Sequence, residues 1–374
     1  MITTGKMSLR VELYRALEDS VPAFLKSLKL GEQAGRYLPC SRGATQLGRE
    51  MGLGWSCFAL KTLHMLGRWD LLEREEREYW VEFIQDYQRT DGDGFFEDPP
   101  EIAYLRKPPP LKARLLGLIG RAPYRPDPQS ILLAETKQAI ATLAEVGTEG
   151  RRPFRGFPQK PERVQQWLES QDWTRPWGAG GQSAGMVVFI KTQAPAFMPQ
   201  RDVDELLDVC RDFYAGLADP ATGAYFRGSV PEHGELVNGA MKVLMALDWL
   251  DMPIHYPDRL AATVLAAPPA QTGCHLVDAI YVLHRALRGH GGEFKADAAT
   301  VAFCRSVAAQ LAAHAHEDGG FSFYARKAQT NYYGVPVSRG LEESDVQGTC
   351  LLVWALSMMA QMCGIDAGWK TMRP

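Results

Sequence analysis

The stretch "SDVQGTCLLVWALSMM" at residues 344–359 is apolar on nearly every face of the helix that it predicts. A helix of this kind has to be buried on all sides. The stretch "DVDELLDVCRDFYAGL" at 202–217 has the same helical spacing of apolar residues but adds a charged face, which is typical of a helix with one side in water. The sequence therefore predicts two classes of helix, one packed inside the other.

These two classes alternate along the chain. Apolar residues recur at helical spacing almost everywhere and β-branched alternation is nearly absent, so we predict an all-α protein. Gly, Pro, Asp and Ser signals divide the chain into helices near 8–29, 53–67, 75–89, 129–147, 161–171, 181–194, 202–217, 235–250, 257–267, 274–288, 296–315 and 344–362. The odd members are amphipathic and the even members apolar. Six such pairs predict an (α/α)6 toroid, in which an outer ring of helices wraps an inner ring.

Three connections share an Asp-Gly turn followed by an aromatic residue: "QRTDGDGFFED" at 88–98, "ADPATGAYFRG" at 218–228 and "EDGGFSFY" at 317–324. Glycine tolerates the positive φ of such a turn. The first and third resemble the Q-x-x-DGGF turns of squalene cyclase and protein prenyltransferase β-subunit repeats, and this resemblance implies an α/α toroid. The chain lacks the D-x-D-D acid motif of squalene-hopene cyclases, the zinc ligands of prenyltransferases and the cysteine pair of lanthionine cyclases. The resemblance therefore implies shape more than chemistry.

Length and composition predict one domain over 1–374, because 374 residues with 46% hydrophobic content can bury one large core. A proline-rich insertion at about 99–128 interrupts the repeat. Its basic, apolar stretch "LKARLLGLIGR" at 111–121 predicts either a lid over the centre of the ring or a contact with a membrane surface.

The charge and the cysteines exclude several classes of function. A net charge of −3 gives no basic face for nucleic acid. No signal peptide and no apolar stretch of roughly 18 residues is present, so we expect a cytoplasmic protein. The seven cysteines form no CxxC pair, and we predict reduced core thiols with no metal or cofactor. The sequence makes no prediction of oligomeric state.

Lysines interrupt three of the apolar helices. They are Lys61 in "ALKTL", Lys191 in "VVFIKTQA" and Lys242 in "AMKVL". A buried ammonium without a partner is costly, so each should meet a carboxylate, the carbonyls of a helix end or an anionic ligand. A lysine near the far end of an inner helix can instead extend its amine out of the ring.

Carboxylates and a histidine are candidates for proton transfer. Asp91, Asp93 and Glu97 either supply the two carboxyl groups that glycoside hydrolysis needs or simply form an Asp-Gly turn. His275 and Asp278 lie at i and i+3 and should share one helix face, where they either act as an acid–base pair or make structural hydrogen bonds.

The loop "TNYYGVPVSRGLEESD" at 330–345 leads into the last inner helix. Its Tyr332, Tyr333 and Asp345 are candidates for catalysis, and Arg339 for binding a carboxylate. The alternative is an ordered loop that packs its aromatic rings on the rim.

Further candidates for substrate binding come from the expected N-terminal ends of the inner helices. The stretch "DWTRPWGAGGQSAG" at 172–185 supplies Trp173, Trp177 and Gln182 beside a glycine-rich helix entry, and Asn238 lies near the start of a later helix. Aromatic faces stack on sugar rings, and amides bind hydroxyl groups.

Three functions remain open on these residues. The leading hypothesis is a cofactor-independent acid–base enzyme, a hydrolase or lyase, that acts on an anionic or hydroxyl-rich saccharide in a central funnel. The resemblance to cyclases and prenyltransferases implies a terpene cyclase or an enzyme that processes prenyl diphosphates. The third is a toroid that binds a glycan or a peptide without catalysis.

Overall fold

The computed structural model describes residues 9–31, 35–108, 126–288, 294 and 296–374. All twelve predicted helices are present. The outer ones are α1 (Val11–Leu28), α4 (Arg74–Gln85), α8 (Pro161–Glu169), α10 (Gln200–Leu217), α12 (Pro257–Leu265) and α14 (Ala298–Leu311). The inner ones are α3 (Leu53–Met65), α7 (Pro128–Glu145), α9 (Pro176–Gln193), α11 (His233–Trp249), α13 (Gly273–Leu287) and α15 (Val346–Met362).

Short elements lie between these helices. They are the helices α2 (Gln46–Glu50) and α5 (Pro99–Arg106), the 3-10 turns η1 (Trp69–Leu71) and η2 (Ala194–Ala196), and a hairpin of β1 (Asn331–Tyr332) and β2 (Val335–Pro336).

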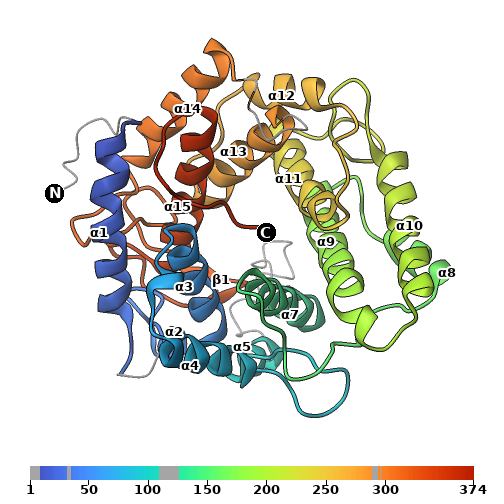
Figure 1. Cartoon of the computed structure of the whole chain (residues 1–374), viewed down its shortest axis with the longest axis horizontal. Coiled ribbons are helices and arrows are strands. Elements are labelled where there is room, and N and C mark those ends of the chain that lie inside the picture. The colour runs from blue at the N-terminus through green and yellow to red at the C-terminus, as the bar shows by residue number, and fades with distance from the viewer. Residues whose placement is uncertain (1–8, 32–34, 109–125, 289–293, 295) are drawn as a thin grey trace.

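The inner helices form a closed ring. Each contacts the next along the chain, and the last of them, α15, packs against the first, α3. Figure 1 shows this ring with α1, α4, α8, α10, α12 and α14 around its outside. The predicted (α/α)6 toroid is confirmed.

The inner and outer helices differ in how many of their side chains are buried. On α15 almost every residue is buried, including Trp354 and Met359. On α10 only the apolar stripe that includes Leu206, Cys210 and Phe213 is buried, while the charged face meets water. Burial on two sides therefore explains why the even helices need no polar face.

Helix α9 begins earlier than predicted, because the glycine-rich stretch is helical rather than a loop. A Cβ on Gly180 would lie 2.8 Å from the Cβ of Lys242, so α9 and α11 pack at a distance that only glycine allows. A Cβ on Gly181 would meet nothing within 4 Å. The cost of glycine within the helix is offset at Gly180 by close packing.

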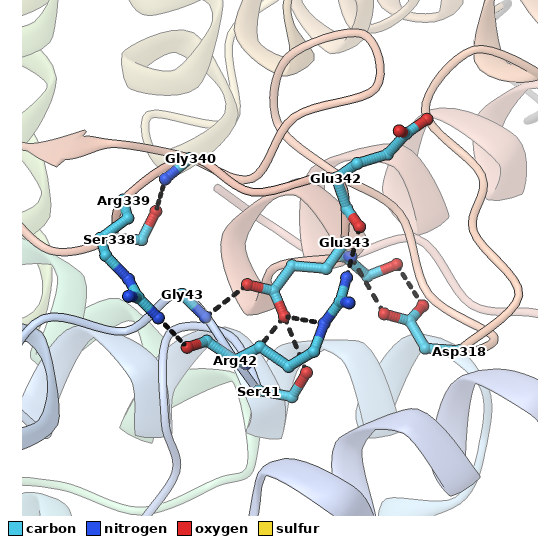
Figure 2. Close-up of polar contacts among 10 residues, drawn as sticks. Ser41, Arg42, Gly43, Asp318, Ser338, Arg339, Gly340, Glu342 and Glu343 are labelled. Atoms are coloured by element: carbon cyan, nitrogen blue, oxygen red, sulfur yellow. Dashed lines mark hydrogen bonds and ion pairs between the residues drawn. The ribbon is translucent and has the colours of Figure 1, made fainter.

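The last long loop closes the ring. The carboxylate of Glu343 accepts hydrogen bonds from the backbone N–H groups of Arg42 (2.8 Å) and Gly43 (2.6 Å) and from the hydroxyl of Ser41 (2.8 Å), as Figure 2 shows. Asp318 of the Asp-Gly-Gly turn accepts from the backbone N–H of Ser344 at 3.0 Å. The contact of Glu343 with Gly43 joins two segments that are 300 residues apart in the sequence.

The structure describes only part of the insertion that the sequence predicts. Of the predicted insertion at 99–128, the structure describes α5 and the residues next to it, whereas 111–121 lies outside the described residues. Within the described part of the chain, no helix is long and apolar enough to cross a membrane.

Candidate active site

Three lysines lie at one level of the inner ring. Lys61 is the ninth residue of α3, and Lys137 and Lys242 are each the tenth residue of α7 and α11. Lys61 is 3% exposed and donates to Oε1 of Gln138 at 3.2 Å. Nζ of Lys242 lies 4.0 Å from Oδ1 of Asp278 on α13. Of these three ammonium groups, the sequence analysis identified Lys61 and Lys242 but missed Lys137.

Lys137 is the most perturbed of the three. Its pKa is lowered well below the usual value, first by burial and then by the ammonium groups of Lys61 and Lys242. A Cβ on Gly185 would be in ordinary contact with the Lys137 stem, at 3.8 Å, so α9 bounds it on one side. An anion placed among these amines would stabilise their charged forms.

Carboxyl groups gather beside the lysines. Glu101 of α5 is 0% exposed and Glu135 of α7 is 1% exposed. Both oxygens of Glu101 and Oε2 of Glu135 have no hydrogen-bond partner within the described residues. Asp98, which precedes α5, uses Oδ2 to accept from the backbone N–H groups of Gly52 and Leu53 at 2.8 and 3.0 Å. In this group, some carboxyl oxygens accept hydrogen bonds and others have no partner among the described residues.

Burial controls the protonation of these acids. It raises the pKa of Glu135 to about 8, although Tyr332 and Lys61 oppose the shift. It also raises the pKa of Glu101 well above the usual value, with the charges of Glu135 and Asp98 adding to the effect. Near pH 7 at least one of these carboxyl groups holds a proton, and a protonated carboxyl can act as a general acid.

Two tyrosines connect this acid group to more open space. The buried Tyr332 of β1 donates its hydroxyl hydrogen to the carboxyl of Glu135. Tyr333 and Gly334 form the hairpin turn with φ values of 45° and 81°, and positive φ is strained for a tyrosine. The Tyr333 side chain is 39% exposed, and its ring centroid lies 4.5 Å from that of Tyr332. The turn therefore places a partly exposed tyrosine beside a buried acid.

Tyr333 lies close enough to Glu135 and Glu101 for their charges to affect its pKa. Although its side chain is partly exposed, desolvation raises its pKa, and the charges of Glu135 and Glu101 raise it further. Tyr333 is thus a proton donor in its resting state rather than a phenolate. To accept a proton it needs a nearby cation.

His275 and Asp278 do not form the expected pair. Nδ1 of His275 lies 2.7 Å from the hydroxyl of Thr272, and its ring meets Trp177 edge to face at a centroid distance of 5.4 Å. Asp278 faces Lys242 instead, and burial raises the pKa of Asp278 to about 6. Both lie on α13, but they have different neighbours.

Trp177, Gln182 and Asn238 lie on the inner helices as predicted. Trp177 and Gln182 are half-buried on the first turns of α9. Asn238 of α11 is buried, and its Nδ2 has no hydrogen-bond partner among the described residues. Their roles in binding remain predictions.

The acidic turn at 91–97 is joined to α7 beside this group, because the N–H of Phe96 donates to Oγ1 of Thr136 at 3.1 Å. Asp91 is exposed and pairs with Arg89 at 3.1 Å, and Glu97 pairs with the same arginine at 3.4 Å. Asp93 is exposed, and its backbone carbonyl accepts from the N–H of Arg155 at 2.9 Å. These contacts are those of an Asp-Gly turn, and a catalytic role for Asp91, Asp93 and Glu97 stays a prediction.

Other predicted residues have structural environments. Trp173 is buried, donates to the carbonyl of Leu168 at 2.7 Å and packs on Phe213 of the outer layer, so it offers no open face to a sugar. Lys191 is the sixteenth residue of α9 and pairs with Asp251 at 3.2 Å. At 1.5 Å per residue, Lys191 lies about 9 Å further along its helix than the other inner lysines lie along theirs.

The 330–345 loop is divided between site and scaffold. Asp345 caps α15: its carboxylate accepts from the backbone N–H groups of Gly348 (2.7 Å), Phe323 (2.7 Å) and Gln329 (2.9 Å). The exposed Arg339 donates to the carbonyl of Arg42 at 2.9 Å, and Figure 2 shows it in the ring-closing contact. Neither side chain extends over the lysines.

Of the residues that the sequence analysis missed, Lys137 had a weak signal in the sequence and Glu101 had none. Lys137 lies in "AETKQAI", where a lysine again interrupts an apolar helix at the same depth as Lys61 and Lys242. Glu101 gave no signal, because "PPEIAYL" resembles an ordinary surface helix with an acid in its first turn. In the described part of the chain, no group of three or more His, Cys, Asp and Glu side chains could hold a metal ion.

Comparison with solved structures gives distant neighbours. No protein-family model and no curated protein matches the chain. A GH76 α-mannanase from Bacteroides thetaiotaomicron is 12% identical, with 94% of this chain and 96% of that one covered and a TM-score of 0.40. A family 76 glycoside hydrolase from a bovine strain of that species is 10% identical, covers 94% and 79%, and has a TM-score of 0.43. Likeness at this level does not identify an activity.

Proposed function

We propose that the protein is an acid–base enzyme that acts on an anionic saccharide held inside the helical ring, as a hydrolase or a lyase. The observation that carries this proposal is the convergence of three inner-helix lysines with a protonated acid group and a partly exposed tyrosine. Glu135 and Tyr332 form the buried proton reservoir, and Tyr333 is the group nearest to a substrate. Lys61, Lys137 and Lys242 bind the anionic groups.

The chemistry follows from the order of these groups. Tyr333 donates a proton to a glycosidic oxygen. The hydroxyl of Tyr332 then turns to donate to the phenolate that forms, and the protonated Glu135 donates to Tyr332 in its place. In an elimination, the lysines neutralise the uronate carboxylate, which acidifies the neighbouring C–H bond. Asp278, ionised at pH 7, is the candidate base that takes this proton as the C–O bond to the protonated glycosidic oxygen breaks. In a hydrolysis, Asp278, whose raised pKa still leaves it largely ionised at pH 7, is the candidate base for water.

The interior favours this proposal over a carbocation cyclase. A cavity that folds a hydrocarbon cation should be lined by aromatic faces and few bases. Here amines and carboxylates from α3, α7, α11 and α13 face the same region. Prenyl diphosphates remain the second substrate class to test, since three ammonium groups also suit a diphosphate.

The direct test is an activity screen with purified protein. Uronate-containing, sulfated and neutral oligosaccharides are incubated beside a prenyl diphosphate, and new reducing ends and unsaturated uronates are measured. We expect turnover of an acidic sugar, reduced about 10²- to 10⁴-fold in Tyr333→Phe, the usual size of a lost general acid. Tyr79→Phe, which changes an exposed tyrosine on α4, is the matched control and should leave the rate unchanged.

Other results would redirect the proposal. Turnover of the prenyl diphosphate alone would establish the cyclase alternative. Binding of a glycan without turnover, unchanged in Tyr333→Phe, would establish a binding toroid.

A further inference from the structure

A cavity lies at the end of the ring where α7, α11 and α13 end. It has a volume of about 450 Å³ and is covered partly by residues 371–373. This size suits a small molecule, for which pockets span roughly 300–1,000 Å³. Figure 1 shows the C-terminal residues within the outline of the ring. The proposed active site uses none of the residues that line this cavity.

Three aromatic side chains lie among the residues that line the cavity, and each is almost fully buried. Tyr281 and Trp354 lie with ring centroids 5.2 Å apart, and Trp249 carries the guanidinium of Arg373 over its ring at 4.9 Å. The N–H of Trp249 is already used, because it donates to the carbonyl of Pro374 at 2.9 Å. Flat apolar faces of this kind suit a planar ligand.

The charge of the wall is positive. Arg285, Arg288 and Arg373 face two carboxylates, Glu145 and Asp248. His284 adds no charge near pH 7, because burial lowers its pKa to about 4. The ends of three helices favour cations through their carbonyl groups, which explains why arginines gather here.

Two hydrogen-bond donors on residues that line the cavity have no acceptor among the described residues. Asp248 engages the hydroxyl of Tyr281 and Nη2 of Arg285, but Nε of Arg285 has no partner among the described residues. Trp354 is 2% exposed, and its Nε1 also has no partner in the described chain. A buried N–H that lines a cavity without an acceptor is costly unless a ligand or water supplies one.

We propose that this cavity binds a small planar organic anion, an aromatic carboxylate or phosphate. The anionic group accepts from Nε of Arg285 and Nε1 of Trp354, and the flat body lies against the aromatic wall. The site is independent of the proposed activity, so either proposal can fail alone.

Calorimetric titration of the full chain tests this site, with benzoate and phenyl phosphate as probes and inorganic phosphate as the probe without a flat body. We expect saturable 1:1 binding of one aromatic probe with a Kd below about 1 mM, and binding of inorganic phosphate weaker by about tenfold. The better aromatic probe also distinguishes a carboxylate ligand from a phosphate.

Two variants locate the binding. Trp354→Phe keeps a ring and removes an N–H that has no partner, and Arg288→Ala removes a charge at the rim; each should weaken binding about tenfold, the usual effect of losing one contact to a charged group. Trp69→Phe and Arg201→Ala, which lie outside this cavity, should leave binding unchanged, as should Lys137→Met. Absence of saturable binding by both aromatic probes, or binding unaffected by both cavity variants, would overturn the proposal.

Discussion

The amine of Lys137 shares the inside of the ring with two other ammonium groups, and this arrangement is unfavourable until an anion faces it. The same region contains Glu135 and Glu101, and burial raises the pKa of both carboxyl groups, so they do not neutralise the amines in full. The sequence could predict that inner lysines need partners. It could not predict that the pKa of the nearest acids would be raised, because a pKa depends on burial in the folded chain.

The raised pKa of Glu135 makes stability depend on pH. Between the pKa of Glu135 in the unfolded chain, about 4.3, and its folded value of about 8, the folded state holds a proton that the unfolded state has lost. The free energy of unfolding should therefore fall as the pH rises through this window and level off above it. Glu135→Gln keeps an acceptor for Tyr332 and removes the titration.

We expect Glu135→Gln to unfold at a higher temperature than the wild type at pH 8, with the difference shrinking towards pH 5. Thermal unfolding across this range measures it, and Glu97→Gln on the exposed turn is the control. An identical pH slope in wild type and Glu135→Gln would contradict the assignment of a buried, protonated Glu135.

At the scale of elements, apolar periodicity predicted all twelve helices, because the spacing of apolar residues shows which faces of a helix are buried. The start of α9 was misplaced, since glycine weakens a helix by propensity and only tertiary packing shows why it is kept. The hairpin that contains Tyr333 was predicted only as a loop, because a tyrosine at positive φ departs from the usual turn rules.

Two glycines of α9 should respond in opposite ways to alanine. In Gly180→Ala the new methyl group meets the Lys242 stem, and α9 must move from α11, so we expect a loss of about 1–3 kcal/mol in the free energy of unfolding. In Gly181→Ala the methyl group meets nothing, and better helix propensity should add up to about 1 kcal/mol. Urea denaturation compares the pair; equal effects would show that α9 and α11 are not held at this distance.

Removing the N-cap of an inner helix should lower the free energy of unfolding more than removing the N-cap of an outer helix. Asp345→Ala removes acceptors from three backbone N–H groups at the buried start of α15, so we expect a loss of about 3 kcal/mol or more. Asp297→Ala removes the cap of the exposed outer helix α14 and should cost about 1 kcal/mol. The same denaturation experiment measures both, and a small effect at Asp345 would return its carboxylate to the candidate catalytic groups.

At the scale of the whole molecule, the ring brings together residues that are far apart in sequence. Lys61 and Lys242 were predictable as equivalent positions of a repeat, whereas the contact of Tyr332 with Glu135 joins a late hairpin to an early helix, and no local pattern encodes it. The acidic turn at 91–97 was predicted from its residue types alone, and in the folded chain Asp91 and Asp93 are exposed. Position in the toroid therefore decides which ionisable residues can share a substrate.

The central claim is that the lysines of α3, α7 and α11 hold an anionic saccharide, and a thermal-shift titration with sulfated and uronate oligosaccharides tests it. Ligand at 100 times its Kd stabilises the folded state by about 2.7 kcal/mol, which raises the melting temperature measurably. We predict this shift in wild type and in Lys191→Met, and its loss in Lys137→Met and Lys242→Met. A shift that survives in both Lys137→Met and Lys242→Met, or one produced only by prenyl diphosphates, would contradict the account.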